Sequence, residues 1–161
     1  MRSKFLVLLA AAAMLAACES TPEDKGGTTG TGGSGPITSQ RAAPGTIGDF
    51  IENVGDRVFF DFDRSDLKPE GRALVERWAV WLKQYPQYKV TIAGHADERG
   101  TREYNLALGE RRAAATRSYL VAQGIPAARV TTISYGKEQP QAVGSNETAW
   151  AQNRRAVAVL Q

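Results

Sequence analysis

The sequence predicts a mixed α/β domain, a two-layer sandwich of helices against a sheet, that follows an export signal and a flexible linker. Three observations predict this organisation. Strand-like runs alternate with helix-periodic segments over residues 46–161. Residues 18–45 are rich in Gly, Ser and Thr and contain few large apolar side chains, so they cannot form a core. Residues 1–17 are a short apolar run behind two positive charges.

The first 17 residues have the pattern of a secretory signal peptide. Arg2 and Lys4 supply its positive start, and the apolar run Phe5–Leu15 is too short to span a membrane. Small residues then lead directly to Cys18, the one cysteine of the chain. A lone thiol cannot form an internal disulfide, whereas an acylated N-terminal cysteine provides a lipid anchor. We predict cleavage before Cys18 and its acylation, palmitate included; an ordinary secreted protein with one free thiol is the alternative.

The charge balance does not point to a polyanionic partner. The net charge of the chain is +3, but 18 basic and 17 acidic residues remain once Arg2 and Lys4 have left with the signal. The sequence pI of about 9.2 is therefore no evidence for nucleic acid, and we expect no nucleic-acid partner. The linker, as a flexible coil, would average about 30 Å from end to end.

The first element of the domain is open to two interpretations. Asp49–Asp63 looks like strand material, with a turn at Asn53–Asp56 between Phe50-Ile51 and Arg57–Phe60. A short helix over Ile47–Val54 is the competing interpretation.

The later elements alternate regularly. Pro69 suits the first turn of a helix that Pro86 ends, and Gly124 with Pro126 ends a second helix. We expect Trp78 and Trp81 in the core. The connections that join the first three strands are long enough for helical crossovers, which favours parallel pairing there. The predicted elements are the helix Ser65–Tyr85, the strand Lys89–Ala93, the helix Tyr104–Gln123, the strand Arg129–Tyr135, the helix Glu147–Arg154 and the strand Ala156–Leu160.

An acid, an amide and a base lie at fixed offsets within residues 94–113. Asp97 falls in the loop before a helix, near its N-terminus. Asn105 and Arg112 are seven residues apart, nearly two helical turns, so they share one face. We expect both at the rim of the buried face, half supported and half exposed. The apolar stripe is predicted one position later, through Leu106, Ala113 and Leu120, with Thr116 between them.

This arrangement suits a ligand that carries both charges. A carboxylate binds an ammonium group, and a guanidinium binds a carboxylate through two parallel hydrogen bonds. An internal salt bridge between Asp97 and Arg112, with no ligand, is an equally good interpretation of the spacing. His95, with Asp97 and Glu98, makes only a weak metal pattern, and we expect no metal and no cofactor.

Four blocks in order resemble one known family. They are Val58–Asp63, Gly94–Ala113, Ser134–Glu138 and Asn153–Val157, and the resemblance covers about Asp56 to Leu160. The chain in this region resembles the family of peptidoglycan-associated lipoproteins, whose members carry an OmpA-like domain. The resemblance implies a non-enzymatic domain that binds the meso-diaminopimelate of the peptidoglycan stem peptide.

The resemblance also assigns roles to residues. It implies that Asp97 holds the ammonium group of diaminopimelate, that Arg112 holds its carboxylate and that Asn105 supports the site. The turn from Phe60 through Asp61 to Asp63 would form one wall, and Arg154 would add a second cation.

Residue 19, directly after Cys18, is Glu. In lipoproteins of this type an Asp there favours retention in the inner membrane, so the resemblance implies the outer membrane, with the domain in the periplasm. The resemblance further implies the Tol–Pal system of envelope integrity and cell division, with TolB and TolA as partners. The alternatives are an anchored protein that binds only other proteins and, less favoured, a cell-wall hydrolase.

Overall fold

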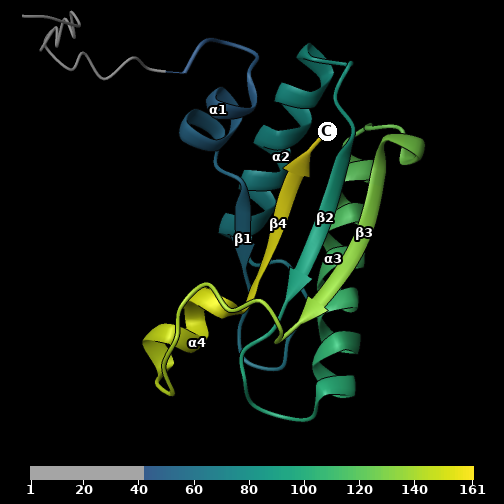
Figure 1. The fold of residues 1–161 in the computed structure, drawn as a ribbon. Coiled ribbons are helices and arrows are strands. Elements are labelled where there is room, and N and C mark those ends of the chain that lie inside the picture. Colours follow the sequence, from purple (N-terminus) through teal and green to yellow (C-terminus); the bar gives the residue numbers. More distant parts are fainter. Residues whose placement is uncertain (1–41) are drawn as a thin grey trace, which may run out of the picture. The chain divides into compact units, whose positions relative to one another are not determined.

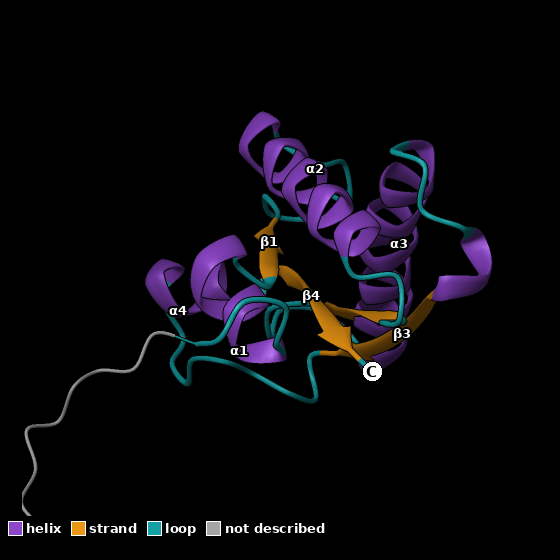
Figure 2. Ribbon diagram, turned by 90° about the horizontal axis from the view of Figure 1, so that it is seen from above, coloured by secondary structure: helices purple, strands orange, loops and turns teal. Residues whose placement is uncertain are grey.

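The computed structural model describes residues 42–161 of the chain. The predicted signal peptide, Cys18 and most of the predicted linker lie outside the described residues. A four-stranded sheet has the order β1 (Arg57–Phe59), β4 (Arg155–Leu160), β2 (Val90–His95) and β3 (Val130–Gly136). The two long helices, α2 (Pro69–Gln84) and α3 (Arg102–Ala122), lie on one side of this sheet (Figures 1 and 2). The predicted α/β sandwich is therefore confirmed.

The segment before β1 is helical, so the predicted strand at Phe50-Ile51 is wrong and the competing helix is right. Helix α1 (Ile47–Asp49) runs into a π-helical turn, Phe50–Val54. The hydroxyl of Thr46 caps the start by accepting from the amide of Asp49 at 3.2 Å. Packing decides this conformation: the helical turn buries the ring of Phe50, whose centroid lies 5.1 Å from that of Trp81.

The sheet confirms one predicted parallel pair and corrects the other. Strands β2 and β3 pair in parallel, from Val90 opposite Val130 onward. Strands β1 and β2 do not pair, because β4 lies between them and is antiparallel to both. Ala156, Ala158 and Leu160 of β4 are buried, and a central position is the one that covers an apolar strand best. The last strand of the chain thus holds the first two together.

Helix α2 begins at Pro69, four residues later than predicted, with the proline in its first turn. Residues 65–68, which were predicted to be helical, instead connect the helix to the turn after β1. Trp78 and Trp81 are buried, as predicted, together with Leu82, Val90 and Ile92 of the main core. The indole N–H of Trp78 donates to the carbonyl of Gly55 at 2.6 Å, which ties the helix to the start of β1.

Helix α3 lies directly on the sheet at two glycines. A Cβ atom on Gly94 of β2 would overlap the backbone of Gly109, and one on Gly109 would lie 2.9 Å from the carbonyl oxygen of Gly94. Only glycine at both positions allows this approach. The contact fixes the height and rotation of α3 above the end of β2, where the candidate site lies.

The buried face of α3 differs from the predicted stripe. Leu106 is 41% exposed, whereas Asn105 is 1% exposed, so the predictions of a buried Leu106 and of a half-exposed Asn105 are both wrong. The face that meets the sheet consists of Asn105, Leu108, Gly109, Arg112, Ala113, Thr116 and Leu120. Within residues 42–161, no helix combines the length and apolarity needed to cross a membrane.

Candidate functional site

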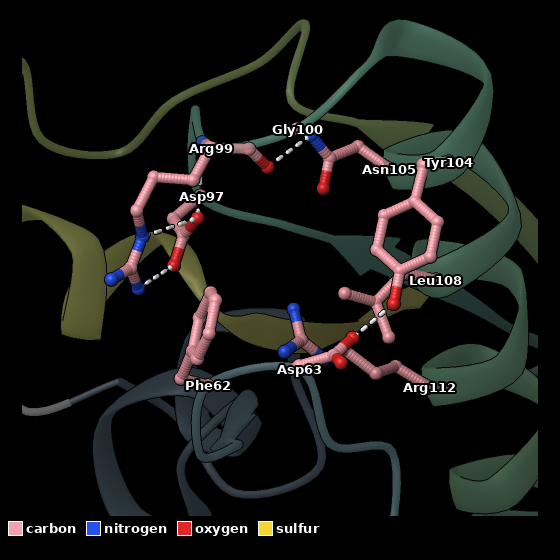
Figure 3. A pocket seen from close by; sticks show the side chains of 9 residues that line it. All are labelled: Phe62, Asp63, Asp97, Arg99, Gly100, Tyr104, Asn105, Leu108 and Arg112. Atoms are coloured by element: carbon pink, nitrogen blue, oxygen red, sulfur yellow. Dashed lines mark hydrogen bonds and ion pairs between the residues drawn. The ribbon is translucent and has the colours of Figure 1, made fainter.

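A pocket of about 200 Å³ lies beyond the C-terminal end of β2. The turn after β1 supplies Phe62 and Asp63, the loop after β2 supplies Asp97 and Arg99, and the first turns of α3 supply Asn105 and Arg112 (Figure 3). Three segments that are distant in the sequence therefore meet around one small space. The pocket brings together the acid, amide and base that the sequence singled out.

Arg112 is a fully buried cation held by backbone carbonyl groups. Its exposed fraction is 0%, so the predicted position at a half-exposed rim is wrong. Its guanidinium donates to the carbonyls of Arg64 at 2.8 Å, His95 at 2.7 Å and Asp61 at 3.1 Å. These carbonyls come from the turn after β1 and the end of β2, which is why helix periodicity could not reveal the burial.

The charge of Arg112 is only partly compensated. Burial lowers the pKa of its guanidinium to about 10, although the nearby carboxylate of Asp97 acts in the opposite direction. None of the ion pairs found within residues 42–161 involves this side chain. An arginine carries five N–H donors, and three of them contact carbonyls. The other two N–H donors have no hydrogen-bond partner among residues 42–161.

Asp97 is buried as well, but it is fully paired inside the chain. One carboxylate oxygen accepts from the backbone N–H and from Nε of Arg99, each at 3.2 Å. The other accepts from Nη2 of Arg99 at 2.6 Å and from Nη1 of Arg154 at 3.4 Å. Burial acts to raise the pKa of Asp97, and hydrogen bonds from Arg99 outweigh it, so the net shift is downward. The ion pairs of Asp97 are thus with these two arginines, and the alternative of an Asp97–Arg112 salt bridge is contradicted.

Sequence reasoning missed Arg99. Its guanidinium lies between two aromatic rings, 4.0 Å from the centroid of Phe62 and 4.0 Å from that of Trp150 on α4 (Glu147–Asn153). The nearness of Arg99 to Asp97 in one loop was a visible signal for an ion pair. Phe62 precedes Arg99 by 37 residues and Trp150 follows it by 51, so local sequence patterns could not show that both rings contact this side chain.

Asn105 links α3 to the loop that carries Asp97. Its side-chain N–H donates to the backbone carbonyl of Arg99 at 2.9 Å. Figure 3 shows its amide oxygen directed toward the open part of the pocket. The amide therefore fixes the loop on one side and offers an acceptor on the other.

The turn after β1 contributes unequally to the pocket. Asp63 lines it, adopts a positive φ of 55° and accepts a hydrogen bond from the hydroxyl of Tyr104. The carboxylate of Asp61 instead faces Lys68 at 3.4 Å, and only its backbone carbonyl serves the site, through Arg112. Phe60 is buried, with its ring centroid 5.2 Å from the guanidinium of Arg112.

Arg154 fastens the end of α4 to the site. Its backbone carbonyl accepts from the N–H of Phe60 at 2.9 Å, and its Nε donates to the carbonyl of Phe60 at 3.1 Å. Its remaining nitrogens contact Asp97 and, at 2.6 Å, the carboxylate of Glu147. The structure therefore places Arg154 behind Asp97, on the protein side of the carboxylate.

His95, the last residue of β2, is buried, with its ring centroid 5.4 Å from that of Tyr135. Burial, with Arg155 nearby, lowers the pKa of its imidazole to about 4, so the ring is neutral at pH 7. Within the part of the chain that the structure describes, no group of three or more His, Cys, Asp or Glu side chains is arranged to hold a metal ion.

Comparison with known proteins gives one consistent result. The model of the OmpA family matches residues 59–154. A protein of Agrobacterium fabrum named peptidoglycan-associated lipoprotein is 50% identical over 161 residues, which cover 99% of this chain and 88% of that protein. The protein of that name from Pseudomonas aeruginosa is 44% identical over 157 residues and 94% of this chain, with 93% of that protein covered.

Solved structures agree with these relatives. The crystal structure of the peptidoglycan-associated lipoprotein from Burkholderia pseudomallei is 44% identical and superposes with a TM-score of 0.66, covering 69% of this chain and 96% of that one. The C-terminal domain of MotB from Helicobacter pylori shares the fold at 19% identity, with a TM-score of 0.60 over 65% of this chain and 83% of that one.

Proposed function

Because the chain belongs to the OmpA family, among the peptidoglycan-associated lipoproteins, we propose that its pocket binds the peptidoglycan stem peptide. The ligand group is the free end of meso-diaminopimelate, where one carbon carries both an ammonium and a carboxylate. The activity is binding without catalysis, in keeping with a family of wall-associated lipoproteins. The pocket supports this proposal because cationic and anionic side chains face one small space of about 200 Å³.

The observation that carries the proposal is the state of Arg112. A buried guanidinium is unfavourable unless its hydrogen bonds and charge are satisfied, and burial lowers the pKa of this one to about 10. Carbonyl groups on three of its N–H donors fix its direction without neutralising it. A ligand carboxylate would accept from the two remaining N–H donors and supply the missing negative charge.

The opposite side of the pocket suits the ammonium group. Asp97 provides a buried carboxylate and Asn105 a side-chain oxygen, whereas the carboxylate of Asp63 lies beside Arg112 (Figure 3). An ammonium group donates three hydrogen bonds, which such acceptors can take up. A ligand with a carboxylate alone or an ammonium alone would satisfy only one side.

The wider role follows from the segments outside the described residues. We infer that residues 1–17 are a signal peptide, that Cys18 carries acyl chains in the outer membrane and that residues 18–45 are a tether. The domain would then lie in the periplasm and hold the membrane to the wall. We propose that the protein belongs to the Tol–Pal system, with TolB and TolA as partners during cell division, as its resemblance to the peptidoglycan-associated lipoproteins implies.

Co-sedimentation with purified peptidoglycan tests the pocket. We expect the wild type to pellet with the wall and to be released by free meso-diaminopimelate. Arg112→Lys, which loses the paired donors, and Asp97→Asn should each weaken binding at least tenfold. Arg117→Lys on the same helix, where the arginine donates to the carbonyl of Val130 at 2.9 Å, and Asp66→Asn on the surface are the matched controls.

The outcomes separate the candidate functions. If Arg112→Lys and Asp97→Asn bind as well as their controls, the ligand binds elsewhere and the proposal is wrong. If wall binding is real but free diaminopimelate does not compete, the ligand group is wrong. The anchor is tested separately, since Cys18→Ser should move the protein from the membrane fraction to the soluble periplasmic fraction.

A further inference from the structure

The carboxylate proposed to receive the ligand's ammonium group has no vacant acceptor position. The two oxygens of a carboxylate offer about four lone-pair sites. Asp97 accepts four hydrogen bonds, three from the backbone N–H, Nε and Nη2 of Arg99 and one from Nη1 of Arg154. An incoming ammonium group therefore needs one of these donors to leave.

The contacts indicate which donor leaves. The side chain of Arg154 is 8% exposed and is also held by the carbonyl of Phe60 and by Glu147. The side chain of Arg99 is 30% exposed and borders the pocket. Its other restraints are the faces of Phe62 and Trp150, which attract a cation without fixing its hydrogen bonds. Arg99 can withdraw at the pocket surface, whereas Arg154 cannot move without disturbing the join between α4 and β1.

We propose that Arg99 is an internal occupant of the ammonium position. Its guanidinium satisfies Asp97 in the free protein, and the ligand's ammonium group binds that carboxylate only after the guanidinium has withdrawn. The inference rests on the proposed function and adds a determinant of affinity to it. It also assigns a purpose to the stack of Phe62, Arg99 and Trp150, which holds the guanidinium in place when no ligand is bound.

The exchange predicts a particular pattern of affinities. Every ligand that uses Asp97 must displace Arg99, so all such ligands are weakened by the same factor. Removing the guanidinium should tighten binding of each by that factor and leave their relative preference unchanged. A ligand without the ammonium group does not compete with Arg99, and its affinity should stay the same.

Titration calorimetry with defined peptides tests the proposal. The probes are the tripeptide L-Ala-γ-D-Glu-meso-diaminopimelate and the same peptide acetylated on the free amino group of its diaminopimelate residue. Breaking one partly exposed ion pair and two cation–π contacts predicts that Arg99→Met binds the free tripeptide about tenfold more tightly. Arg99→Lys, which keeps the charge but not the paired donors, should lie between Arg99→Met and the wild type.

Arg102→Met is the matched control, because Arg102 is 66% exposed and pairs with Glu138 outside the pocket. Circular dichroism establishes that each variant is folded, and the side-chain Nε–H resonance of Arg99 should shift when the wild type binds the tripeptide. Tighter binding by Arg99→Met, with unchanged binding of the acetylated peptide, supports the exchange, even if wild-type binding is too weak to detect.

Two other results overturn the proposal, and they are distinguishable. If the wild type binds the tripeptide and Arg99→Met binds it equally or more weakly, Arg99 is not a competitor, and the proposed function still stands. If neither protein binds the tripeptide, the proposed function fails and the exchange fails with it.

Discussion

Two glycines inside the long helices should respond in opposite directions to the same substitution. In a helix interior, alanine is favoured over glycine by about 1 kcal/mol. At Gly71 of α2, an added Cβ would lie 3.5 Å from the nearest side-chain atom of Leu67 and 3.8 Å from that of Val58, which is ordinary contact. Gly71 lies in the first turn of α2, so Gly71→Ala should raise the free energy of unfolding by about 0.5–1 kcal/mol.

At Gly109 of α3 the same methyl group has no room. It would clash with the hydroxyl of Ser134 and lie 2.9 Å from the carbonyl oxygen of Gly94. That hydroxyl donates to the carbonyl of Leu106 at 2.7 Å, so moving it also breaks a hydrogen bond. Overpacking costs about 1–3 kcal/mol; because one clash is with the backbone of Gly94, the cost here should lie at the upper end, about 2–3 kcal/mol, which exceeds the gain of about 1 kcal/mol in helix propensity. Gly109→Ala should lower the free energy of unfolding by about 1–2 kcal/mol.

Urea denaturation of the two variants beside the wild type measures both effects. The expected difference between Gly71→Ala and Gly109→Ala is about 1.5–3 kcal/mol. Gly109→Ala should also weaken peptide binding, because lifting α3 from β2 moves Arg112 away from the carbonyls that orient it. If both variants are stabilised equally, the direct contact between α3 and β2 is not what positions the site.

Three further predictions concern groups outside the pocket. His95 has a pKa of about 4 in the folded protein, so between pH 6.5 and 4 only the unfolded chain binds a proton at this residue. The free energy of unfolding should therefore fall as the pH is lowered through that range. An equally steep fall in the His95→Phe variant would contradict this prediction. Asn153→Ala removes hydrogen bonds of 2.7, 3.0 and 2.7 Å to residues 141 and 142. In urea denaturation, the variant should lose about 3 kcal/mol of unfolding free energy. A loss below about 1 kcal/mol would show that Asn153 does not hold this loop. Arg129→Met removes donors to the last carbonyls of α2, at 3.0 Å for Leu82, and should speed amide exchange at that helix end while leaving α3 unchanged.

Local patterns in the sequence were enough to predict most of the fold. The alternation of strand and helix periods predicted each strand from β1 to β4 and the helices α2, α3 and α4, with errors of at most four residues at their ends. The spacing of Asn105 and Arg112 placed both on one face of α3, and the structure brings both to one pocket. These features depend on neighbours within a few turns, so periodicity can reveal them.

The rest depends on contacts between distant segments. The place of β4 between β1 and β2 depends on contacts with two strands that are distant in the sequence, which no local pattern encodes. Arg112 seemed suited to a half-exposed rim because the carbonyls that enclose it belong to other segments. Arg154, one partner of Asp97, was missed for the same reason, since it is 57 residues away. Arg99, the other partner, is only two residues from Asp97, but the two rings that stack on it come from other segments.

The two sides of the pocket are prepared differently, and this difference suggests an order of binding. Lowering the pKa of Arg112 to about 10 corresponds to about 3 kcal/mol against its charged form. A ligand carboxylate would offset part of this cost of burying the charge, because two N–H donors of Arg112 have no other partner among residues 42–161. Asp97 offers no such gain, since arginines of the chain already satisfy it. The carboxylate end of the ligand should therefore engage first, and the ammonium end should follow as Arg99 withdraws.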